Sequence, residues 1–272
     1  KASQSGVQVE AHRLQWGPKK AVTSRWGYTA EVQPVITVAK IAADPSHLHF
    51  RDAQQILNTD VKTIEAMAKE EGALIAFNGV YFSSHTPPSY YTIGAPVVRD
   101  GVVVSQANDS AEWSLLGWND GRWSREYISG ATVQQQLGNG LRFSISDHHV
   151  PVEGGQVVYT WPEDGVQPYS MFGQIDASHY VIAIGEYAHR SDVAAACVAY
   201  GAQTVVELNG GNCAYLYLKG VGNAPNPGAT TNTLKQLNKL NLLFNEEMAM
   251  LGIFGGKGMG GPDQSIDMIY FK

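Results

Sequence analysis

The apolar positions of this chain fall into short runs that are separated by glycine, aspartate and proline, a pattern typical of strands joined by tight turns. In the middle of the chain, Asp100-Gly101 and Asp120-Gly121 each separate two such runs, which predicts two β-hairpins. The longer runs predict strands at 35–44, 73–82, 178–186, 203–211 and 214–220, with 48–53 continuing the first sheet and a last strand at 265–272.

Apolar residues at helical spacing predict a few helices between these strands, at about 59–71, 191–200 and 233–250. Thr59 or Asp60 is placed to cap the first helix, and Gly72 is placed to end it. The leucine-rich stripe of the last helix fits core packing better than a membrane or a partner helix. The sequence therefore predicts an α+β fold: a mixed, twisted sheet with a few packing helices in a single domain.

The domain organisation follows from the absence of a convincing linker. We expect an N-terminal extension over 1–30 and one domain over 31–272, a length that can bury a sizeable core. A net charge of -6 and a pI near 5.7 argue against a nucleic-acid partner. No apolar run reaches the roughly 18 residues of a transmembrane segment.

The composition also favours a location outside the cell. The chain has 29 Gly, 13 Tyr and 6 Trp but only 16% charged residues, which suits a loop-rich, β-rich protein that acts on carbohydrate. It opens at Lys1 without Met, so we expect a removed leader and a secreted or cell-surface protein. Cys197 and Cys213 lack zinc-ligand spacing, and both a disulfide and two buried thiols remain open.

Two apolar runs end in similar turn chemistry, at Asn78-Gly79 and at Asn209-Gly210-Gly211-Asn212. Strand ends of this kind can converge at one edge of a sheet, where binding loops often lie. Glu207 and Asn209 are two residues apart, so an extended strand would point both side chains to one face. The Asn-Gly-Gly-Asn residues that join 203–211 to 214–220 predict a type I′ hairpin, and their glycines also allow the close backbone approach to a ligand that one wall of a sugar site needs.

Four segments resemble the phosphodiester glycosidase family in order and spacing, over roughly residues 30 to 220. They are "GALIAFNGVYF", "GAPVVRDGVVVS", "FGQIDASHYVIAIGE" and "AAACVAYGAQTVVELNGGNCAYLYLKG", where the family has A-x-N-G-G-F-F, G-x-x-V-x-x-G, R-T-A-I-G and A-L-N-L-D-G-G-G-S. The resemblance implies hydrolysis of a sugar–phosphodiester linkage in a glycan or cell-surface polymer. It implies no cofactor, and a divalent cation such as Ca²⁺ is conceivable but has no loop motif here.

The chain departs from the family pattern at its polar positions. Tyr169 stands where the pattern has arginine, and Asn209 stands where it has aspartate. Val80, Tyr81, Asn212 and Cys213 also replace pattern residues. These changes remove a cation and a carboxylate, so the alternative is a non-catalytic carbohydrate-binding or cell-surface protein on the same scaffold.

Glu207 offers a replacement for the missing carboxylate. The pattern has asparagine two residues before its aspartate, whereas here Glu207 precedes Asn209, so the two groups have exchanged places. Cleavage at an anomeric carbon needs negative charge near an oxocarbenium-like centre. We therefore expect Glu207 to be the catalytic carboxylate, with Asn78 and Asn209 binding sugar hydroxyls. An ordinary glycosidase would instead need a second carboxylate about 5–9 Å away.

The leaving phosphate requires cations or N–H donors, for which His189, Arg190 and the 209–212 amides are candidates. His189 and Arg190 begin a helix, where anions are favoured, although Ser191 or Asp192 can simply cap that helix. Asp176 fits a turn, and Asp147-His148-His149 fits a solvated turn better than a metal site. The full set of expected substrate-binding residues is Gly79, His85, Ser170, His189, Arg190, Gly210, Gly211 and Asn212.

Overall fold

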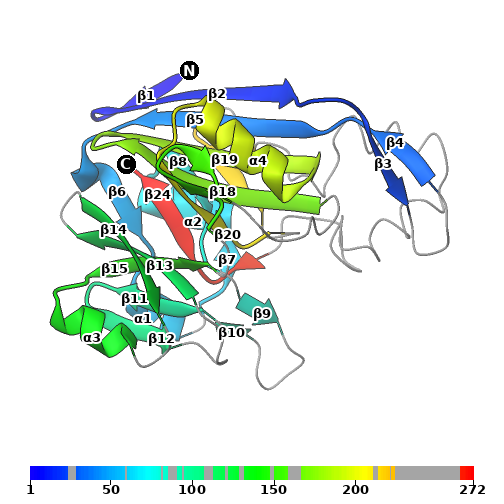
Figure 1. Ribbon diagram of the computed structural model, residues 1–272. Helices are drawn as coiled ribbons and strands as arrows, with labels where there is room; N and C mark the ends of the chain where they lie inside the picture. The colour runs from blue at the N-terminus through cyan, green and yellow to red at the C-terminus, as the bar shows by residue number, and fades with distance from the viewer. Residues whose placement is uncertain are drawn as a thin grey trace.

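The protein is built from two facing β-sheets with a helix on the outer side of the larger one (Figure 1). The computed structural model describes residues 1–23, 29–58, 60–80, 82–84, 91–93, 95–106, 113–119, 122–128, 132–147, 150–158, 167–210, 214–220, 222–223 and 264–272. The predicted helix over 233–250 lies outside these residues. None of the helices in the described ranges has the length and apolar character needed to cross a bilayer.

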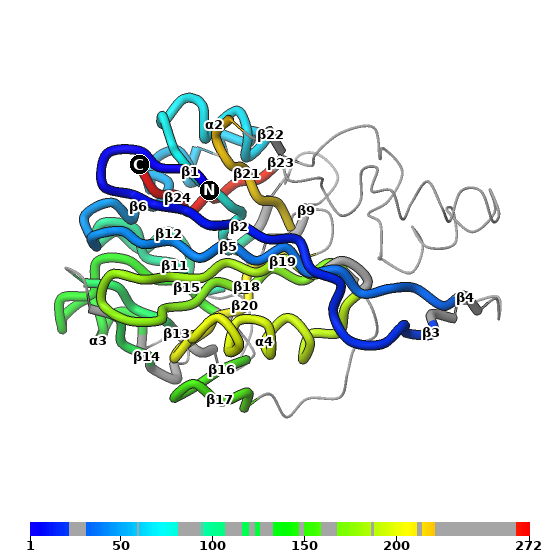
Figure 2. The backbone as a smooth tube through the Cα atoms, turned by 90° about the horizontal axis from the view of Figure 1, so that it is seen from above, coloured from blue at the N-terminus to red at the C-terminus, as the bar shows by residue number. Residues whose placement is uncertain are grey.

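The larger sheet has eight strands, and its order can be followed across the molecule in Figure 2. From edge to edge these are β1 (Ala2–Gln4), β2 (Val7–Gln15), β5 (Val35–Ala42), β19 (His179–Ala188), β18 (Gln167–Asp176), β20 (Thr204–Leu208), β16 (Val152–Glu153) and β17 (Gln156–Val157). Residues 2–15, which the sequence assigns to an N-terminal extension, thus form part of this sheet, because Val7 and Val9 alternate into its buried face.

The second sheet has five strands and covers the inner face of the first. Its order is β22 (Gly222–Asn223), β21 (Leu216–Leu218), β8 (Ile75–Asn78), β24 (Met268–Phe271) and β6 (Leu48–Phe50). The sequence places 48–53 in the first sheet, but β6 pairs with β24 in the second sheet. In this position the side chains of Leu48 and Phe50 are buried in the core between the two sheets. The last strand is confirmed as β24.

Smaller hairpins and ribbons complete the β structure. They are β3 (Lys20–Thr23) with β4 (Thr29–Val32), β7 (Lys62–Thr63) with β23 (Gln264–Ser265), β9 (Phe82–Ser84) with β10 (Tyr91–Ile93), β11 (Pro96–Arg99) with β12 (Val102–Gln106), and β13 (Trp113–Asn119) with β14 (Arg122–Ile128) and β15 (Phe143–Asp147). Both predicted Asp-Gly hairpins are confirmed as strand pairs. Asp100 and Gly101 have φ of 48° and 76°, the backbone that a type I′ turn demands.

The α+β class is confirmed, with one correction to the sheet. Every strand pairing among the described residues is antiparallel, where the sequence predicts a mixed sheet. The β19–helix–β20 unit looks like a parallel crossover in sequence. In the structure β18 lies between β19 and β20 and pairs antiparallel with each of them.

The core between the two sheets is aromatic. Phe172 of β18 packs against Phe77 of β8 and Phe271 of β24, with ring centroids 5.0 Å and 6.3 Å apart. These rings are fully buried, and each burial of this kind stabilises the fold by about 1.5–3 kcal/mol. The aromatic core therefore fixes how the two sheets lie against each other.

Four helices occur in the described residues: α1 (Ala53–Leu57), α2 (Ile64–Glu71), α3 (Thr132–Gly138) and α4 (Arg190–Ala199). The predicted start of α2 near residue 59 is wrong, because Lys62 and Thr63 are extended and the Thr63 hydroxyl accepts the Ala66 N–H at 3.1 Å as the helix cap. Its predicted end is confirmed, since Gly72 adopts a φ of 68°. α4 matches its prediction and packs on the outer face of the large sheet (Figures 1 and 2).

The predicted hairpin between 203–211 and 214–220 is wrong. β20 pairs with β18 and β16 in the large sheet, whereas β21 pairs with β8 and β22 in the small one. Leu208 and Leu216 both reach the core between the sheets, so the chain passes from one layer to the other at this point. The described residues on either side, Leu208 and Leu216, therefore belong to different layers.

Candidate functional site

The two Asn-Gly segments meet, as the sequence predicts. The Asn78 side chain donates from Nδ2 to the Asn209 carbonyl at 2.5 Å, and the Asn209 N–H donates to the Gly79 carbonyl at 3.0 Å. The end of β8 in the small sheet is thus joined to the end of β20 in the large sheet. The prediction that these two strand ends converge is confirmed.

The Asn78 side chain stabilises this junction through two hydrogen bonds to backbone groups. Its side chain is fully buried, and its Oδ1 accepts the Tyr215 N–H at 3.1 Å while its Nδ2 holds Asn209. Both functions of the amide are thus used by backbone groups, as buried polar groups require. In this geometry Asn78 fixes where the chain leaves β20 and where it enters β21.

Gly79 and Gly210 are required by close contacts within the protein. A Cβ atom on Gly79 would lie 1.9 Å from Oδ2 of Asp267, and one on Gly210 would lie 2.8 Å from the Pro168 carbonyl oxygen. Both distances are below the contact distance of real atoms, so no other residue fits without rearrangement. The sequence attributes these glycines to a ligand or a turn; the described contacts attribute them to neighbouring protein groups.

Glu207 and Arg190 form an ion pair on the outer face of the large sheet. Glu207 lies opposite Met171 in the register of β18 and β20, on the face that α4 covers. Arg190, the first residue of α4, brings its Nε to 2.5 Å from Glu207 Oε2. The two side chains are only 7% and 12% exposed, so the interaction is weakly screened by solvent.

Arg190 also restores a cation beside the strand where the family pattern has its arginine. Its guanidinium carbon lies 4.7 Å from the centre of the Tyr169 ring, within the range of a cation–π contact. Tyr169 occupies the position of that missing arginine in the sequence pattern. A cation and a carboxylate therefore lie together beside the start of β18 and the end of β20, although each comes from a position different from that of the pattern.

The start of α4 gathers further charged groups. The His189 N–H donates to Asp192 Oδ2 at 2.9 Å, which confirms Asp192 as a cap of the helix. Lys20 of β3 lies 2.8 Å from the same carboxylate oxygen. Lys20 could not be predicted from the sequence, because a single lysine on a short strand far from Asp192 along the chain carries no motif.

Ser170 lies on the opposite face of the sheet from Glu207. Its neighbours Tyr169 and Met171 face α4, and Ser170 itself is paired with Leu208 and is fully buried. Its hydroxyl has no hydrogen-bond partner among the described residues. Ser170 and Glu207 therefore do not share one surface, and an expected role for Ser170 in substrate binding stays a prediction.

The remaining candidates divide into two groups. His85, Gly211, Asn212 and Cys213 lie outside the described residues, as do His148 and His149. Cys197 is a free thiol in the core, so it forms no disulfide, and burial raises its pKa to about 12. Asp176 is confirmed in a turn, where the Ser178 N–H donates to its carboxylate at 2.9 Å and holds its pKa below the usual value.

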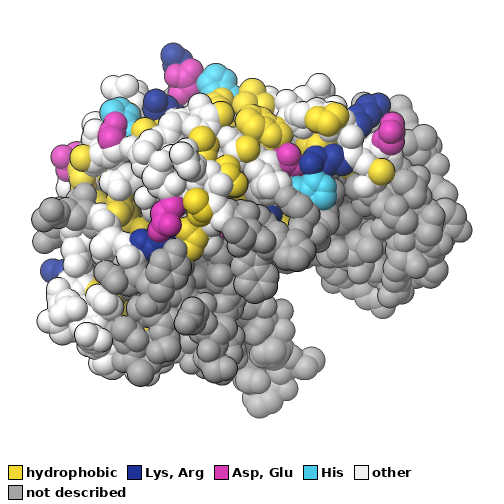
Figure 3. All heavy atoms as spheres, viewed as in Figure 1, with side chains coloured by type: hydrophobic (Ala, Val, Ile, Leu, Met, Phe, Trp, Pro, Cys, Tyr) yellow, Lys and Arg dark blue, Asp and Glu magenta, His cyan; other side chains and the backbone are white. Residues whose placement is uncertain are grey.

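The described residues contain no group of three or more His, Cys, Asp or Glu side chains placed to hold a metal ion. On the face shown in Figure 3, the described acidic and basic side chains lie interspersed and form no large patch of one sign.

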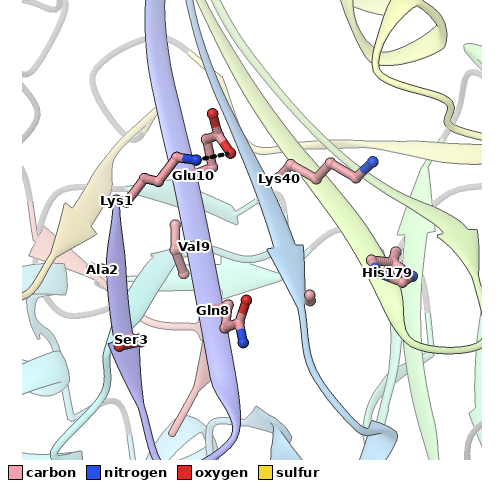
Figure 4. Close-up of a pocket in the computed structure, with 9 residues that line it drawn as sticks. Lys1, Ala2, Ser3, Gln8, Val9, Glu10, Lys40 and His179 are labelled. Atoms are coloured by element: carbon pink, nitrogen blue, oxygen red, sulfur yellow. Dashed lines mark ion pairs between the residues drawn. The ribbon is translucent and has the colours of Figure 1, made fainter.

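A pocket of about 530 Å³ lies elsewhere on the outer face of the large sheet (Figure 4). Lys1 and Glu10 pair across its rim at 3.3 Å, and Lys40 and His179 lie on the neighbouring strands. Neither Glu207 nor Asn78 lines this pocket. The space is therefore separate from the joined strand ends.

Comparison with known proteins gives the fold. No protein-family model matches the sequence, and no curated protein matches it. Among solved structures, the catalytic domain of zebrafish N-acetylglucosamine-1-phosphodiester α-N-acetylglucosaminidase, auto-inhibited by its pro-peptide, aligns with a TM-score of 0.64 at 12% identity, over 100% of this chain and 85% of that chain. A candidate exported protein from Burkholderia pseudomallei aligns with a TM-score of 0.51 at 10% identity, over 89% of this chain and 76% of that chain. The chain therefore has the fold of that catalytic domain, which agrees with the resemblance of its motifs.

Proposed function

We propose that this protein is a glycoside hydrolase-type enzyme that cleaves a sugar–phosphodiester linkage in a glycan or cell-surface polymer. The observation that carries the proposal is the Glu207–Arg190 pair at the end of β20, next to the joined strand ends at Asn78 and Asn209. A carboxylate and a cation side by side match the two charges that develop when a glycosyl phosphate bond breaks. The shared fold of the zebrafish catalytic domain supports the same reaction class.

The roles follow from charge. As the bond between the anomeric carbon and the phosphate oxygen breaks, positive charge grows on the sugar, and the Glu207 carboxylate stabilises it. The departing phosphate keeps the bridging oxygen and its negative charge, which the Arg190 guanidinium and the first N–H groups of α4 stabilise. Water adds its hydroxide to the anomeric carbon and releases its proton. The products are a free sugar and a phosphate monoester.

Turnover of a panel of chromogenic sugar phosphodiesters tests this proposal. Glu207→Gln keeps the shape of the side chain and removes its charge, so kcat should fall by about a hundredfold or more. Glu71→Gln is the matched control, because Glu71 is also a carboxylate paired with a cation, Lys272, at 3.1 Å. Full turnover in Glu207→Gln would remove Glu207 from the mechanism.

A non-catalytic carbohydrate-binding protein is the second candidate. Two observations favour it: Arg190 and Glu207 already neutralise each other, and the Asn78 amide is used within the protein. Saturable binding on a glycan array, without turnover of any phosphodiester or simple glycoside, would support this candidate. Turnover of simple glycosides with equal efficiency would instead indicate an ordinary glycosidase.

We also propose export to the cell surface or the medium, supported by the composition of the chain. Fractionation of cells that express the full natural protein tests this, with the protein expected in the medium or the surface fraction. Recovery only from the cell interior would contradict export and would leave the reaction proposal intact.

A further inference from the structure

A buried ion pair, Arg99–Asp267, contacts the backbone of residues 78–80 at the end of β8. Asp267, the residue before β24, and Arg99, the last residue of β11, are 0% and 1% exposed. Arg99 donates from Nη2 to Asp267 Oδ2 at 2.6 Å, and the same oxygen accepts the Val80 N–H at 3.0 Å. One carboxylate oxygen thus joins the arginine to the backbone of the turn.

Arg99 is itself held in place by several elements. Its Nη1 donates to the carbonyls of Val98 at 3.0 Å and Ser144 at 2.5 Å, and its guanidinium lies 5.1 Å from the centre of the Phe50 ring. Three strands therefore fix this guanidinium from different sides. Because a guanidinium is planar and rigid, the fixed guanidinium of Arg99 also fixes the position of the Asp267 carboxylate that it binds.

Asp267 touches the turn closely enough to dictate its shape. The close approach of its Oδ2 leaves room only for glycine at position 79. On its other side, the Gly79 carbonyl accepts the Asn209 N–H at 3.0 Å, while the Asn78 amide holds the Asn209 carbonyl. A continuous set of contacts therefore runs from Arg99 through Asp267 and Gly79 to Asn209, two residues beyond Glu207.

Stability alone does not account for this arrangement. Taking a carboxylate and a guanidinium out of water is costly, and apolar residues of similar volume often stabilise a core as well or better. In addition, Oδ1 of Asp267 has no hydrogen-bond partner among the described residues. What an apolar pair cannot supply is an acceptor at a fixed point for the Val80 N–H.

We infer that Asp267, oriented by Arg99, is a positioning residue for the site at β20. Asp267 fixes the position of the Asn78–Val80 segment through the Val80 N–H, and the Gly79 carbonyl of that segment fixes the position of Asn209. The end of β20, which carries Glu207, is positioned in turn. The inference rests on the proposed function for its catalytic consequence, whereas its structural part concerns the Asn209 position alone. Asp267 touches no reacting atom and acts only through the turn.

The test replaces the pair by apolar residues, in the double variant Arg99→Met/Asp267→Leu. Hydrogen exchange of the Asn209 amide, measured by NMR, should become about tenfold faster, because the turn that accepts this N–H is no longer fixed. kcat on the phosphodiester panel should fall by about tenfold or more with little change in KM, as expected for displaced catalytic groups. Asp267→Asn keeps an acceptor for the Val80 N–H, so Asn209 exchange and kcat should stay near their wild-type values in the folded protein, while the lost counter-charge of the buried Arg99 lowers the free energy of unfolding.

Arg99→Lys keeps the charge of the pair and serves if the apolar pair does not fold. It loses the rigid fork, so Asn209 exchange should still rise by about threefold or more. Glu71→Gln is the control: Glu71, the last residue of α2, accepts the Tyr270 hydroxyl of β24 at 2.9 Å, and its loss should leave Asn209 exchange unchanged.

The two levels of the inference fail separately. Unchanged Asn209 exchange in a folded variant without the pair would overturn the positioning role, whatever the activity. Faster exchange with unchanged kcat in an active enzyme would overturn the catalytic consequence, that Asp267 positions the site at β20. No turnover in the wild type, together with faster exchange in the variants, would overturn the proposed function and leave Asp267 as the residue that positions Asn209.

Discussion

At the residue level, the geometry of the candidate site depends on the hydrogen-bond or ion-pair partner of each polar side chain. Glu207 faces Arg190, Asn78 holds two backbone groups, and Asp267 holds a turn. Their residue types and the convergence of the two Asn-Gly segments could be predicted from the sequence. The partners could not, because Arg190 reaches Glu207 through the packing of α4, and Arg99 and Asp267 are 168 positions apart.

The Arg190–Glu207 pair predicts an asymmetric effect of mutation on stability. Arg190→Gln leaves the Glu207 carboxylate in a nearly buried site without its cation, so the free energy of unfolding should fall by about 3–5 kcal/mol. Arg190→Met/Glu207→Leu removes both charges and should cost far less. Urea denaturation of the two variants measures this difference. A loss below about 1 kcal/mol in Arg190→Gln would mean that the pair behaves like a surface ion pair.

At the scale of elements, local patterns predicted the strands well and their partners poorly. Alternation found β5, β19 and β24, and Asp-Gly found the hairpin of β11 and β12, because these signals are contained in a few neighbouring residues. The assignment of β6 and β21 to the wrong neighbours has one cause: strand propensity does not say which sheet a strand joins. That choice is made by the aromatic core between the layers.

The contact between β6 and β24 predicts a dependence of stability on pH. His49 of β6 stacks on Tyr270 of β24 at 5.3 Å, and burial, together with the nearby cations of Lys272 and His47, lowers its pKa. The folded protein then binds a proton at His49 less readily than the unfolded chain does. Stability from neutral His49 is therefore present above the usual histidine pKa of about 6.5 and is lost as the pH falls through it.

His49→Phe keeps a ring against Tyr270 and removes the titrating group. Thermal unfolding of both proteins between pH 7.5 and pH 5 measures the effect: the wild type should lose more stability on acidification than the variant does. Parallel losses in the two proteins would show that His49 titrates alike in the folded and unfolded states.

At the scale of the whole molecule, two sheets meet at one point where the chain crosses between them. Asn78 at the end of β8 and Asn209 just after β20 are bonded there; Arg190 of α4 pairs with Glu207 two residues earlier, and Asp267, paired with Arg99, accepts the Val80 N–H. The sequence indicated this point through motif resemblance, and the fold agrees with that resemblance. Its charges, however, stand at positions different from those of the charges in the family pattern: Glu207 two residues before the pattern's aspartate, and Arg190 outside the quoted segments.

Hydrolysis of an active sugar phosphodiester in ¹⁸O-labelled water, with the products analysed by mass spectrometry, shows which bond of the substrate breaks. The label should enter the anomeric hydroxyl of the sugar, because water attacks carbon and the phosphate keeps its bridging oxygen. Glu207→Gln should lose this reaction. Label in the phosphate monoester would show attack at phosphorus and would contradict a glycosidase acting through Glu207.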